Sequence, residues 1–339
     1  MRLPIFASLI CLLAASVSAQ WAVVAKLPSG RSDAAVASVN GRLCVIGGTA
    51  GRSVDIYDPR SGQWSRKAGM PTRRWGAAAC TVGSMIYGAG GWDGARVHDT
   101  VERYDVTEDR WDAVTSMPTA RGWLSLTAVD GIIYAIGGET VELDVFDFDI
   151  LDTVEAFDPT TGEWTERESM AEARNAHGAA TLDGRMYIVG GWGSGGAAAN
   201  PLDTMEIYDP ETDRWEHGPD VDPMPEGGRS ALSASTVGPF VYAIGGRGFD
   251  DLVGFGQRTN LDRVERFDVR SQRWQVQPPL NVPQRDHSSV VIRGVIYVAG
   301  GSAWSVERFD TGLAVEPFDG SRHLATTFGA VKRGAGASQ

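Results

Sequence analysis

The stretch Asp-Gly-Ile-Ile-Tyr-Ala-Ile-Gly-Gly at residues 130–138 joins a tight-turn signal to a short β-rich run that ends in a glycine pair. Six such glycine pairs occur along the chain, at Gly47-Gly48, Gly90-Gly91, Gly137-Gly138, Gly190-Gly191, Gly245-Gly246 and Gly300-Gly301. Each precedes an aromatic-aspartate pair: Tyr57-Asp58, Tyr104-Asp105, Phe157-Asp158, Tyr208-Asp209, Phe267-Asp268 and Phe309-Asp310. A unit that recurs roughly every 50 residues predicts a repeat protein built as a single unit.

Spacing inside each unit is nearly constant. From the aromatic residue to the next tryptophan the step is seven residues, as from Tyr57 to Trp64, in all five units that contain both. A recurring arginine stands 16 residues before the glycine pair in five units and 15 before it in the last. The steps from the glycine pair to the aromatic residue vary, at 9, 13, 19, 17, 21 and 8. Length variation therefore concentrates in one segment of each unit, which predicts variable loops on a rigid scaffold.

A β-rich run with a terminal glycine pair, followed by an aromatic-aspartate pair and a tryptophan, resembles the kelch repeat. The resemblance covers essentially the whole chain after residue 19 and implies an all-β fold, a six-bladed β-propeller of four-stranded antiparallel blades. The pairs Asn40-Gly41, Asp130-Gly131 and Asp183-Gly184 predict two-residue hairpins between the first two strands of a blade. We expect the glycine pairs to permit close approach of backbones near the channel, and the repeated aromatic rings to pack between blades.

The two ends of the repeat array suggest how the ring closes. A complete last unit would have its tryptophan seven residues after Phe309, but that position is Glu316. Trp21 stands ten residues before Arg31 with no strand of its own blade before it. We therefore expect the segment Trp21 to Lys26 to complete the last blade as its outer strand, which removes a free sheet edge. The alternative is that Leu313 to Phe318 finishes the blade locally.

The first residues predict an exported protein. Met1-Arg2, the apolar run Leu3 to Ala15 and the small residues Val17-Ser18-Ala19 have the order of a signal peptide with its cleavage site. We expect a signal peptide at 1–19, the propeller at 20–318 and a partly disordered tail at 319–339, in a secreted or periplasmic protein. The net charge of −12 argues against nucleic acid as a partner, and no apolar run is long enough for confident membrane insertion. We expect a monomer.

Two cysteines follow the signal segment, Cys44 and Cys80. An oxidising compartment permits a disulfide between them, but they stand at different heights of neighbouring repeats, and two buried thiols are the favoured interpretation.

The antiparallel order of strands a to d, counted outward from the channel, decides which loops share a face. The variable b-to-c segments and the d-to-a connections crowd one mouth of the channel, where we expect a ligand to bind. The candidate ligand-binding residues are the recurring arginines and the side chains after the glycine pairs: Arg31, Arg74, Arg121, Arg174, Arg229, Arg285, Trp92, Trp192, Arg247 and Trp304. For the arginines a structural role is favoured over ligand contact, because a residue that recurs in every unit serves architecture more often than catalysis. The recurring acids are expected to accept structural hydrogen bonds between blades: Asp55, Glu102, Glu155, Glu206, Glu265 and Glu307.

The preferred function is a non-catalytic binding scaffold for a protein, peptide or glycan ligand, with no cofactor and no metal. The main alternative is a sugar-acid epimerase or mutarotase, because secreted bacterial kelch propellers of this size resemble N-acetylneuraminate epimerase. Such chemistry needs an acid-base pair at the mouth, for which Glu139, Glu226 or His287 together with Arg174 or Arg229 would serve. His177 and His287 occupy the same height in two blades and are expected to be packed rather than catalytic. The acidic insertion with Asp144, Asp147, Asp149 and Asp152 is expected to be solvated rather than to bind calcium.

Overall fold

The computed structural model describes residues 20–142, 147–194, 201–216, 221–249 and 258–313. Within them the chain is almost entirely β-structure, with one 3₁₀ turn, η1 (Gly48–Ala50). The expected signal peptide at 1–19, the tail at 319–339 and the alternative closing segment after Leu313 lie outside the described residues.

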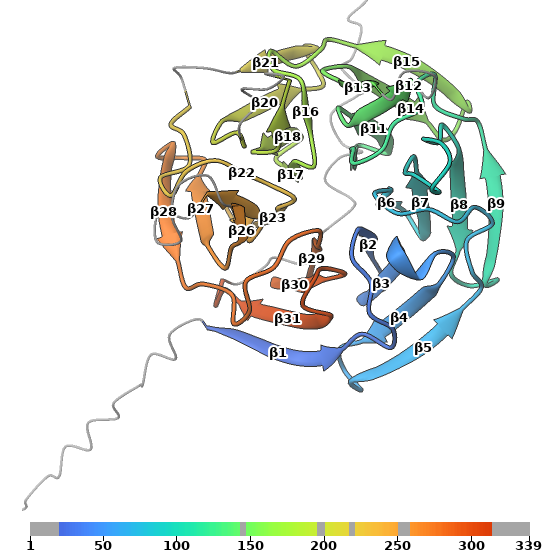
Figure 1. Cartoon of the computed structure of the whole chain (residues 1–339), viewed down its shortest axis with the longest axis horizontal. Coiled ribbons are helices and arrows are strands. Elements are labelled where there is room, and N and C mark those ends of the chain that lie inside the picture. Colours follow the sequence, from blue (N-terminus) through green and yellow to red (C-terminus); the bar gives the residue numbers. More distant parts are fainter. Residues whose placement is uncertain (1–19, 143–146, 195–200, 217–220, 250–257, 314–339) are drawn as a thin grey trace, which may run out of the picture.

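Six four-stranded antiparallel sheets are arranged around a common centre (Figure 1). The first sheet in chain order contains β2 (Ala34–Val39), β3 (Arg42–Gly47), β4 (Val54–Asp58) and β5 (Gln63–Lys67). The second contains β6 (Ala78–Val82), β7 (Met85–Ala89), β8 (Val101–Asp105) and β9 (Arg110–Val114). The third contains β10 (Ser125–Val129), β11 (Ile132–Ile136), β14 (Val154–Asp158) and β15 (Glu163–Arg167). The other three are β17 (Gly178–Leu182), β18 (Arg185–Val189), β20 (Met205–Asp209) and β21 (Arg214–Glu216); β23 (Ser233–Val237), β24 (Phe240–Ile244), β27 (Val264–Asp268) and β28 (Arg273–Gln277); and β29 (Ser288–Ile292), β30 (Val295–Ala299), β31 (Ser305–Asp310) and β1 (Trp21–Lys26). The expected four-stranded antiparallel sheets of an all-β fold are confirmed.

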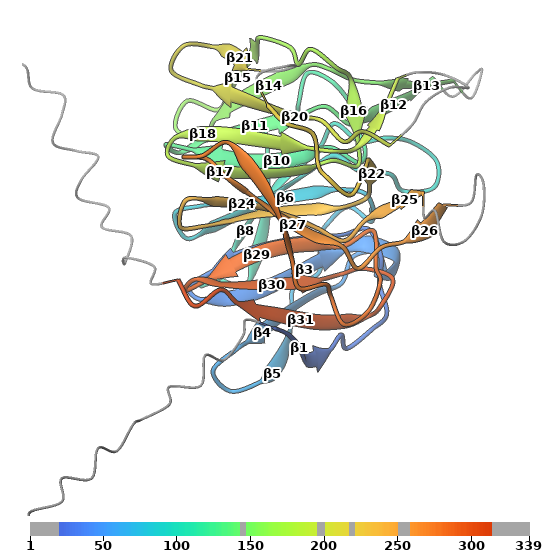
Figure 2. The same ribbon diagram turned by 90° about the vertical axis from the view of Figure 1, so that its left-hand side faces the viewer.

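The remaining strands form small accessory sheets. They are the hairpin β12 (Glu139–Glu142) and β13 (Asp147–Ile150), the pair β16 (Arg174–Asn175) and β19 (Trp192–Gly193), and the three-stranded sheet β22 (Arg229–Ser230), β25 (Arg247–Phe249) and β26 (Arg258–Asn260). All of them stand on the same side of the molecule (Figure 2). We call this side, which carries the b-to-c and d-to-a segments, the loop face.

Aromatic residues explain the constant step of seven. Tyr57 lies opposite Trp64 in the register of β4 and β5, and Tyr104 lies opposite Trp111 in β8 and β9. The Trp111 indole then donates a hydrogen bond of 2.9 Å to the carbonyl of Ala68, which belongs to the connection leaving the previous sheet. Trp164, Trp215 and Trp274 make the equivalent hydrogen bond to the connection leaving the previous sheet, whereas the Trp64 indole has no hydrogen-bond partner among the described residues; the four bonded rings confirm packing between repeats.

Apolar side chains fill the spaces between neighbouring sheets. Leu43 and Val45 of β3 pack with Tyr297 and Ala299 of β30, so the first and last sheets share a core as the intermediate neighbours do.

The glycine pairs allow the close approach expected from the sequence. Gly90 has a φ of +67°, and a Cβ at this position would lie 2.3 Å from the carbonyl oxygen of Arg121 in the next repeat. The following amide, of Gly91, donates to that same carbonyl at 2.9 Å. The hairpin turn at Asn40-Gly41 also has the two positive φ values, 51° and 71°, that a type I′ turn requires.

The N-terminal strand β1 pairs antiparallel with β31, the last strand of the chain in the described residues. Trp21 lies opposite Phe309, with ring centroids 5.0 Å apart and planes inclined by 24°. Its indole donates to the carbonyl of Pro278 at 3.0 Å, as Trp111, Trp164, Trp215 and Trp274 do to their neighbouring repeats. Trp21 thus takes the structural position in the last repeat that Glu316 would otherwise occupy.

Candidate functional site

Five of the six recurring arginines are inaccessible to a ligand. Arg31, Arg74, Arg121, Arg174 and Arg229 are all 0% exposed. Each pairs with the acid of its own repeat; for example, Arg74 Nη2 lies 2.6 Å from Glu102 Oε2 and Arg121 Nη2 lies 3.0 Å from Glu155 Oε1. The expectation that these five arginines bind ligand is wrong, because their side chains are covered and each guanidinium group is paired with an acid inside the protein. The structural interpretation holds for them.

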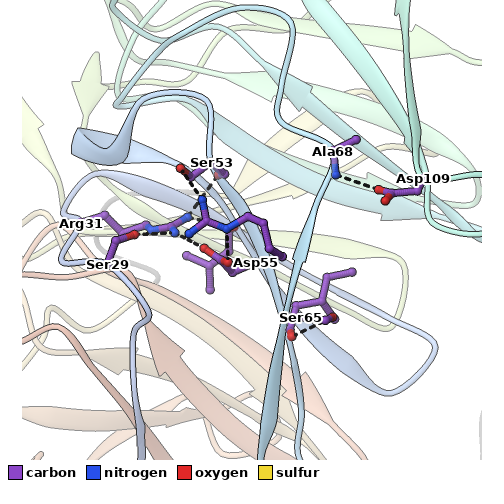
Figure 3. A network of polar contacts seen from close by, with 10 residues as sticks. Ser29, Arg31, Ser53, Asp55, Ser65, Ala68 and Asp109 are labelled. Carbon is purple, nitrogen blue, oxygen red and sulfur yellow. Dashed lines mark hydrogen bonds and ion pairs between the residues drawn. The ribbon is translucent and has the colours of Figure 1, made fainter.

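The environment of Arg31 shows how the two terminal nitrogens of such a guanidinium group are bound within the protein (Figure 3). Its guanidinium donates to the hydroxyl of Ser29 at 2.9 Å and to the carbonyl of Ser53 at 3.1 Å, and it pairs with the carboxylate of Asp55. Burial lowers the pKa of Arg31, and the charge of Asp55 opposes that shift. The Arg31–Asp55 ion pair is a buried structural part of the sheet, because each charge compensates the other away from water.

The recurring acids act on the connection that enters their own sheet. The Glu206 carboxylate accepts from the amide of Ala171 at 2.8 Å as well as from Arg174. Likewise, Glu265 accepts from the amide of Glu226 at 2.9 Å. The expected structural role is therefore present, but the acceptors bind the d-to-a connection of their own repeat and not the strands of the adjacent sheet.

In the last repeat, the buried arginine position is occupied by a glutamine, and the arginine follows one position later. Gln284, 16 residues before Gly300, occupies the buried arginine position and donates to Glu307 Oε1 at 3.3 Å. Arg285, which the sequence suggested as the sixth member, is partly exposed, with a side-chain exposure of 34%, and pairs with Asp286 at 3.2 Å. Arg285 stands 15 residues before the glycine pair, whereas the buried arginines stand 16 before theirs. This difference was the signal that Arg285 lies one position after the buried arginine position.

Six residues form a cyclic chain of backbone hydrogen bonds on the loop-face side of the channel. Each lies 14 residues before a glycine pair, and each has a positive φ. The amide of each donates to the carbonyl of its counterpart in the preceding repeat, at 2.7 to 3.1 Å, and the amide of Asp33 donates to Asp286 at 3.0 Å. The six members of this ring, which we call the mouth ring, are Asp33, Gly76, Trp123, Ala176, Ala231 and Asp286.

The mouth ring surrounds a small cavity of about 90 Å³ and carries two carboxyl groups. Asp33 Oδ1 accepts a hydrogen bond of 3.1 Å from the indole of Trp123. Burial raises the pKa of Asp33, and burial together with the charge of Asp33 raises the pKa of Asp286 to about 6. Neighbouring carboxyls disfavour double ionisation, so this pair is suited to hold a proton near neutral pH.

Replacing Asp286 by asparagine is expected to stabilise the protein above neutral pH. The folded-state pKa of Asp286 is about 6 against an ordinary value of 3.8, so the folded state binds the extra proton and its stability falls as pH rises through that window. Asp286→Asn removes this penalty, and asparagine tolerates the positive φ of the site. The gain in unfolding free energy should grow from near zero at about pH 4 to about 2 to 3 kcal/mol at about pH 8, measured by urea unfolding.

A pH-independent difference between the two proteins would contradict this account of Asp286. Glu163→Gln, at an exposed position on β15, serves as the control and should leave stability unchanged across the same range.

Exposed aromatic and basic side chains surround the mouth ring. Trp304 is 59% exposed and covers Gly30, where a Cβ would lie 2.6 Å from the indole. Trp92 is half-buried, and its backbone pairs with that of Trp75. Arg258 lies over the ring of Trp192, with its guanidinium carbon 4.3 Å from the ring centroid. Side chains of this kind can stack on a ligand and pair with its charges.

Three arginines from the last two repeats, Arg247 on β25, Arg258 on β26 and Arg285 before β29, form a basic cluster on the loop face. Burial lowers the pKa of Arg247, and the charges of Arg285 and Arg258 lower it further, while Asp286 opposes the shift. This basic cluster contrasts with the acidic side of the face, where Glu139 and Asp149 lie. The loop face therefore offers charges of both signs within one mouth.

The kelch-repeat family matches most of this chain. A kelch-repeats domain described as that of KLHDC2, KLHL20 and DRC7 matches residues 144–301, and the kelch motif matches residues 30–71 and 73–118. The chain is a kelch-repeat protein. Its similarity to the kelch repeat, inferred from the glycine pairs and tryptophans, is confirmed.

Relatives of known sequence align over parts of their length. Kelch-like protein terF of Aspergillus terreus is 33% identical over 159 residues, which is 44% of this chain and 32% of that protein. Kelch-like protein 36 of Mus musculus is 33% identical over 215 residues, 60% of this chain and 34% of that protein. This kelch chain thus spans about a third of the length of the relatives it matches.

Among solved structures, the one titled "Structure of YjhT" is similar in fold, with a TM-score of 0.71 at 15% identity. The alignment covers 83% of this kelch chain and 94% of that one. At this identity the likeness concerns the fold alone.

Two of the histidines of this kelch protein, His177 and His287, are packed, as the sequence favoured. His177 Nε2 lies 2.8 Å from the Ser125 hydroxyl, and burial lowers the pKa of His177 to about 3. His287 Nε2 donates to the carbonyl of Ile244 at 3.0 Å, and burial lowers its pKa to about 4. Both imidazoles are therefore neutral at physiological pH and hold neighbouring sheets together beside a channel of about 370 Å³.

Both cysteines of the described residues are buried free thiols. Burial raises the pKa of Cys44 to about 12, which makes this thiol unreactive. The open question of a Cys44–Cys80 disulfide is thereby answered in favour of separate thiols.

Of the remaining candidates from the sequence, Glu226 makes structural contacts and Asp144 lies outside the described residues. Glu226 contributes its amide and carbonyl to the Glu265 and Arg263 contacts. Asp144 lies outside the described residues, and among those that are described no group of three or more His, Cys, Asp or Glu side chains could hold a metal ion. No helix in the described part of the chain has the length and hydrophobicity needed to span a bilayer.

Sequence reasoning missed Asp33, Asp286, Trp123 and Arg258. The first three share the column 14 residues before the glycine pair, and comparing that column across repeats would have shown two carboxyls among small residues. Arg258 lay in a variable segment with no counterpart in other repeats, so spacing carried no signal for it.

Proposed function

We propose that this kelch protein is an exported binding scaffold that recognises a protein or peptide ligand on the loop face of a closed six-bladed propeller. The closed ring is supported by the pairing of β1 with β31 and by the cycle of six hydrogen bonds in the mouth ring. Export is supported by the charged start and apolar run of residues 1–19. A propeller at 20–318 accounts for all six repeats.

The observation that carries the binding role is the concentration of exposed and half-buried aromatic and basic side chains on one face. Trp304, Trp192 and Trp92 and the basic cluster of Arg247, Arg258 and Arg285 surround the mouth ring. Aromatic rings and arginines supply much of the binding energy at protein interfaces, because aromatic rings bury large areas with few torsions lost and the planar guanidinium group offers several hydrogen-bond donors. The five buried arginines support this face from within but do not contact ligand.

Arrays of peptides and glycans, probed with residues 20–339, test this role. Arg247→Ala and Trp304→Ala are expected to weaken capture of the same peptides at least tenfold. Arg42→Ala is the control, because Arg42 is an exposed arginine at the a-to-b turn on the opposite face. Equal binding by all three variants would contradict the assignment of the loop face. Capture of glycans alone would identify the ligand as carbohydrate.

The second candidate is a sugar epimerase or mutarotase, favoured by the Asp33 and Asp286 pair. One carboxyl would remove the proton of an anomeric hydroxyl while the other protonates the ring oxygen, which opens the ring to the carbonyl form; the reverse transfers close it on the other face. Proton NMR exchange spectroscopy with glucose and glucuronic acid would show accelerated anomer exchange, lost in Asp33→Asn. If the protein does not change the anomer exchange rate, the epimerase candidate is rejected and the binding scaffold remains the proposed function.

A further inference from the structure

A second cavity lies away from the channel, between two accessory segments of the loop face. It has a volume of about 360 Å³ and is lined by the hairpin β12–β13 on one side and by β19 with Asn175 on the other. Asn175 pairs with Trp192 in the β16–β19 ladder, and Glu139 pairs with Ile150 in the β12–β13 ladder. We call this cavity the hairpin pocket. Its walls come from regular strands, so their side chains have fixed positions.

Hydrogen-bond acceptors dominate the polar side chains of the hairpin pocket. The Asn175 amide nitrogen donates one of its two N–H groups to Glu139 Oε2 within the protein. The groups left for a ligand are the second N–H and the oxygen of the Asn175 amide, the second oxygen of Glu139 and the carboxylate of Asp149, so acceptors outnumber donors among them. Such a pocket favours a ligand rich in N–H or O–H donors.

The Glu139 carboxylate is partly buried without a cationic partner among the described residues. Burial raises the pKa of Glu139, and only the Asn175 hydrogen bond opposes this shift. No salt bridge to Glu139 is formed by the described arginines, lysines or histidines, in contrast to the buried acids of the sheets. A bound cation would supply the missing compensation for this charge.

Aromatic side chains flank these acceptors. Phe148 lines the pocket and is 55% exposed, the highest exposed fraction among the described phenylalanines. Trp192 also lines it, while Arg258, which covers part of the Trp192 ring, does not. Arg258 therefore holds the indole in place from outside the pocket. Aromatic faces beside carboxylates favour a planar, weakly hydrated cation.

We infer that the hairpin pocket binds the guanidinium group of an arginine side chain presented by a peptide ligand. This inference rests on the proposed role as a peptide-binding scaffold and names one side chain that the scaffold selects. The guanidinium donates to Glu139 and Asp149, and the apolar stem of the arginine packs on Phe148. Lysine fits less well because its ammonium is more strongly hydrated and lacks the planar fork that matches a carboxylate. The carboxylates repel acidic side chains.

The test uses residues 20–339 and three probe peptides, acetyl-Gly-Gly-Arg-Gly-Gly-amide and its citrulline and lysine analogues. Citrulline has nearly the shape of arginine without its charge. Titration calorimetry, with tryptophan fluorescence as a second readout, should show that the arginine peptide binds at least tenfold more tightly than the citrulline peptide. Glu139→Gln and Asp149→Asn should each weaken arginine binding at least threefold and leave citrulline binding unchanged. Asp149 is exposed, so its replacement keeps the test valid if Glu139→Gln disturbs folding.

Glu163→Gln is the matched control, because it removes one exposed carboxylate from the outer strand β15 that does not line the hairpin pocket. Equal affinity for the arginine and citrulline peptides, or full arginine binding by both pocket variants, would overturn the inference. Peptide capture on arrays that depends on Arg247 and Trp304 but not on arginine in the ligand would reject this pocket and keep the scaffold role. Absence of capture in both assays would reject the scaffold role itself.

Discussion

Replacing Arg229 by methionine is expected to lower the free energy of unfolding by about 3 to 5 kcal/mol. Arg229 and Glu265 are both 0% exposed and form an ion pair, so the substitution leaves the Glu265 carboxylate buried without its counter-charge. The double variant Arg229→Met, Glu265→Gln should recover much of the loss, because it removes the orphaned charge as well. Urea unfolding followed by tryptophan fluorescence measures all three proteins.

Arg285→Met is the control for this prediction. Arg285 is partly exposed, and its pair with Asp286 is at the surface of the mouth, where such pairs contribute about 0 to 1 kcal/mol. If Arg229→Met and Arg285→Met had equal effects, the distinction between a buried architectural column and a surface residue would be wrong.

Replacing Trp21 by alanine is expected to cost about 3 to 5 kcal/mol of stability, as for other large buried aromatic residues. Trp21 is 3% exposed, stacks on Phe309 and donates to Pro278, so its loss removes the contacts that hold β1 on the last sheet. This variant tests the proposed closure of the ring by the N-terminal strand. Thermal and urea unfolding of residues 20–339 provide the measurement.

Val23→Ala belongs to the same strand but changes a side chain that is 51% exposed, so it should shift stability by about 0.5 kcal/mol or less. A Trp21→Ala protein as stable as Val23→Ala would show that β1 contributes nothing to the last sheet, and the closure proposal would fail.

The fold was predictable because its determinants are local and repeated. The step from Tyr57 to Trp64 reports the register of two adjacent strands, and the glycine pairs report backbone contacts that no other residue tolerates. These constraints act within one repeat or between neighbours, so six copies reinforce one interpretation. The pairing of Trp21 could be inferred only because the last repeat lacks its own tryptophan.

The site was less predictable because spacing shows where a residue lies along a strand but not what covers it. Arg74 and Arg285 both precede a strand a, yet one is enclosed by Glu102 and the other faces solvent, and a difference of one position decides which. Asp33 and Asp286 belong to opposite ends of the chain and meet only because the first and last repeats are adjacent in space. The hairpin pocket depends on contacts between insertions that have no counterpart in other repeats.

In the mouth ring, the main chain sets the width of the channel opening, and the side chains set the chemistry of its rim. Its six bonds use only main-chain amides and carbonyls, which every residue except proline can provide, so the side chains at these positions do not determine the spacing of the repeats. Aspartate, tryptophan, alanine and glycine all occupy the ring in this one molecule. A single substitution there can therefore exchange a charged rim for an aromatic or a bare one while the aperture keeps its diameter, which gives such proteins a direct route to new selectivity.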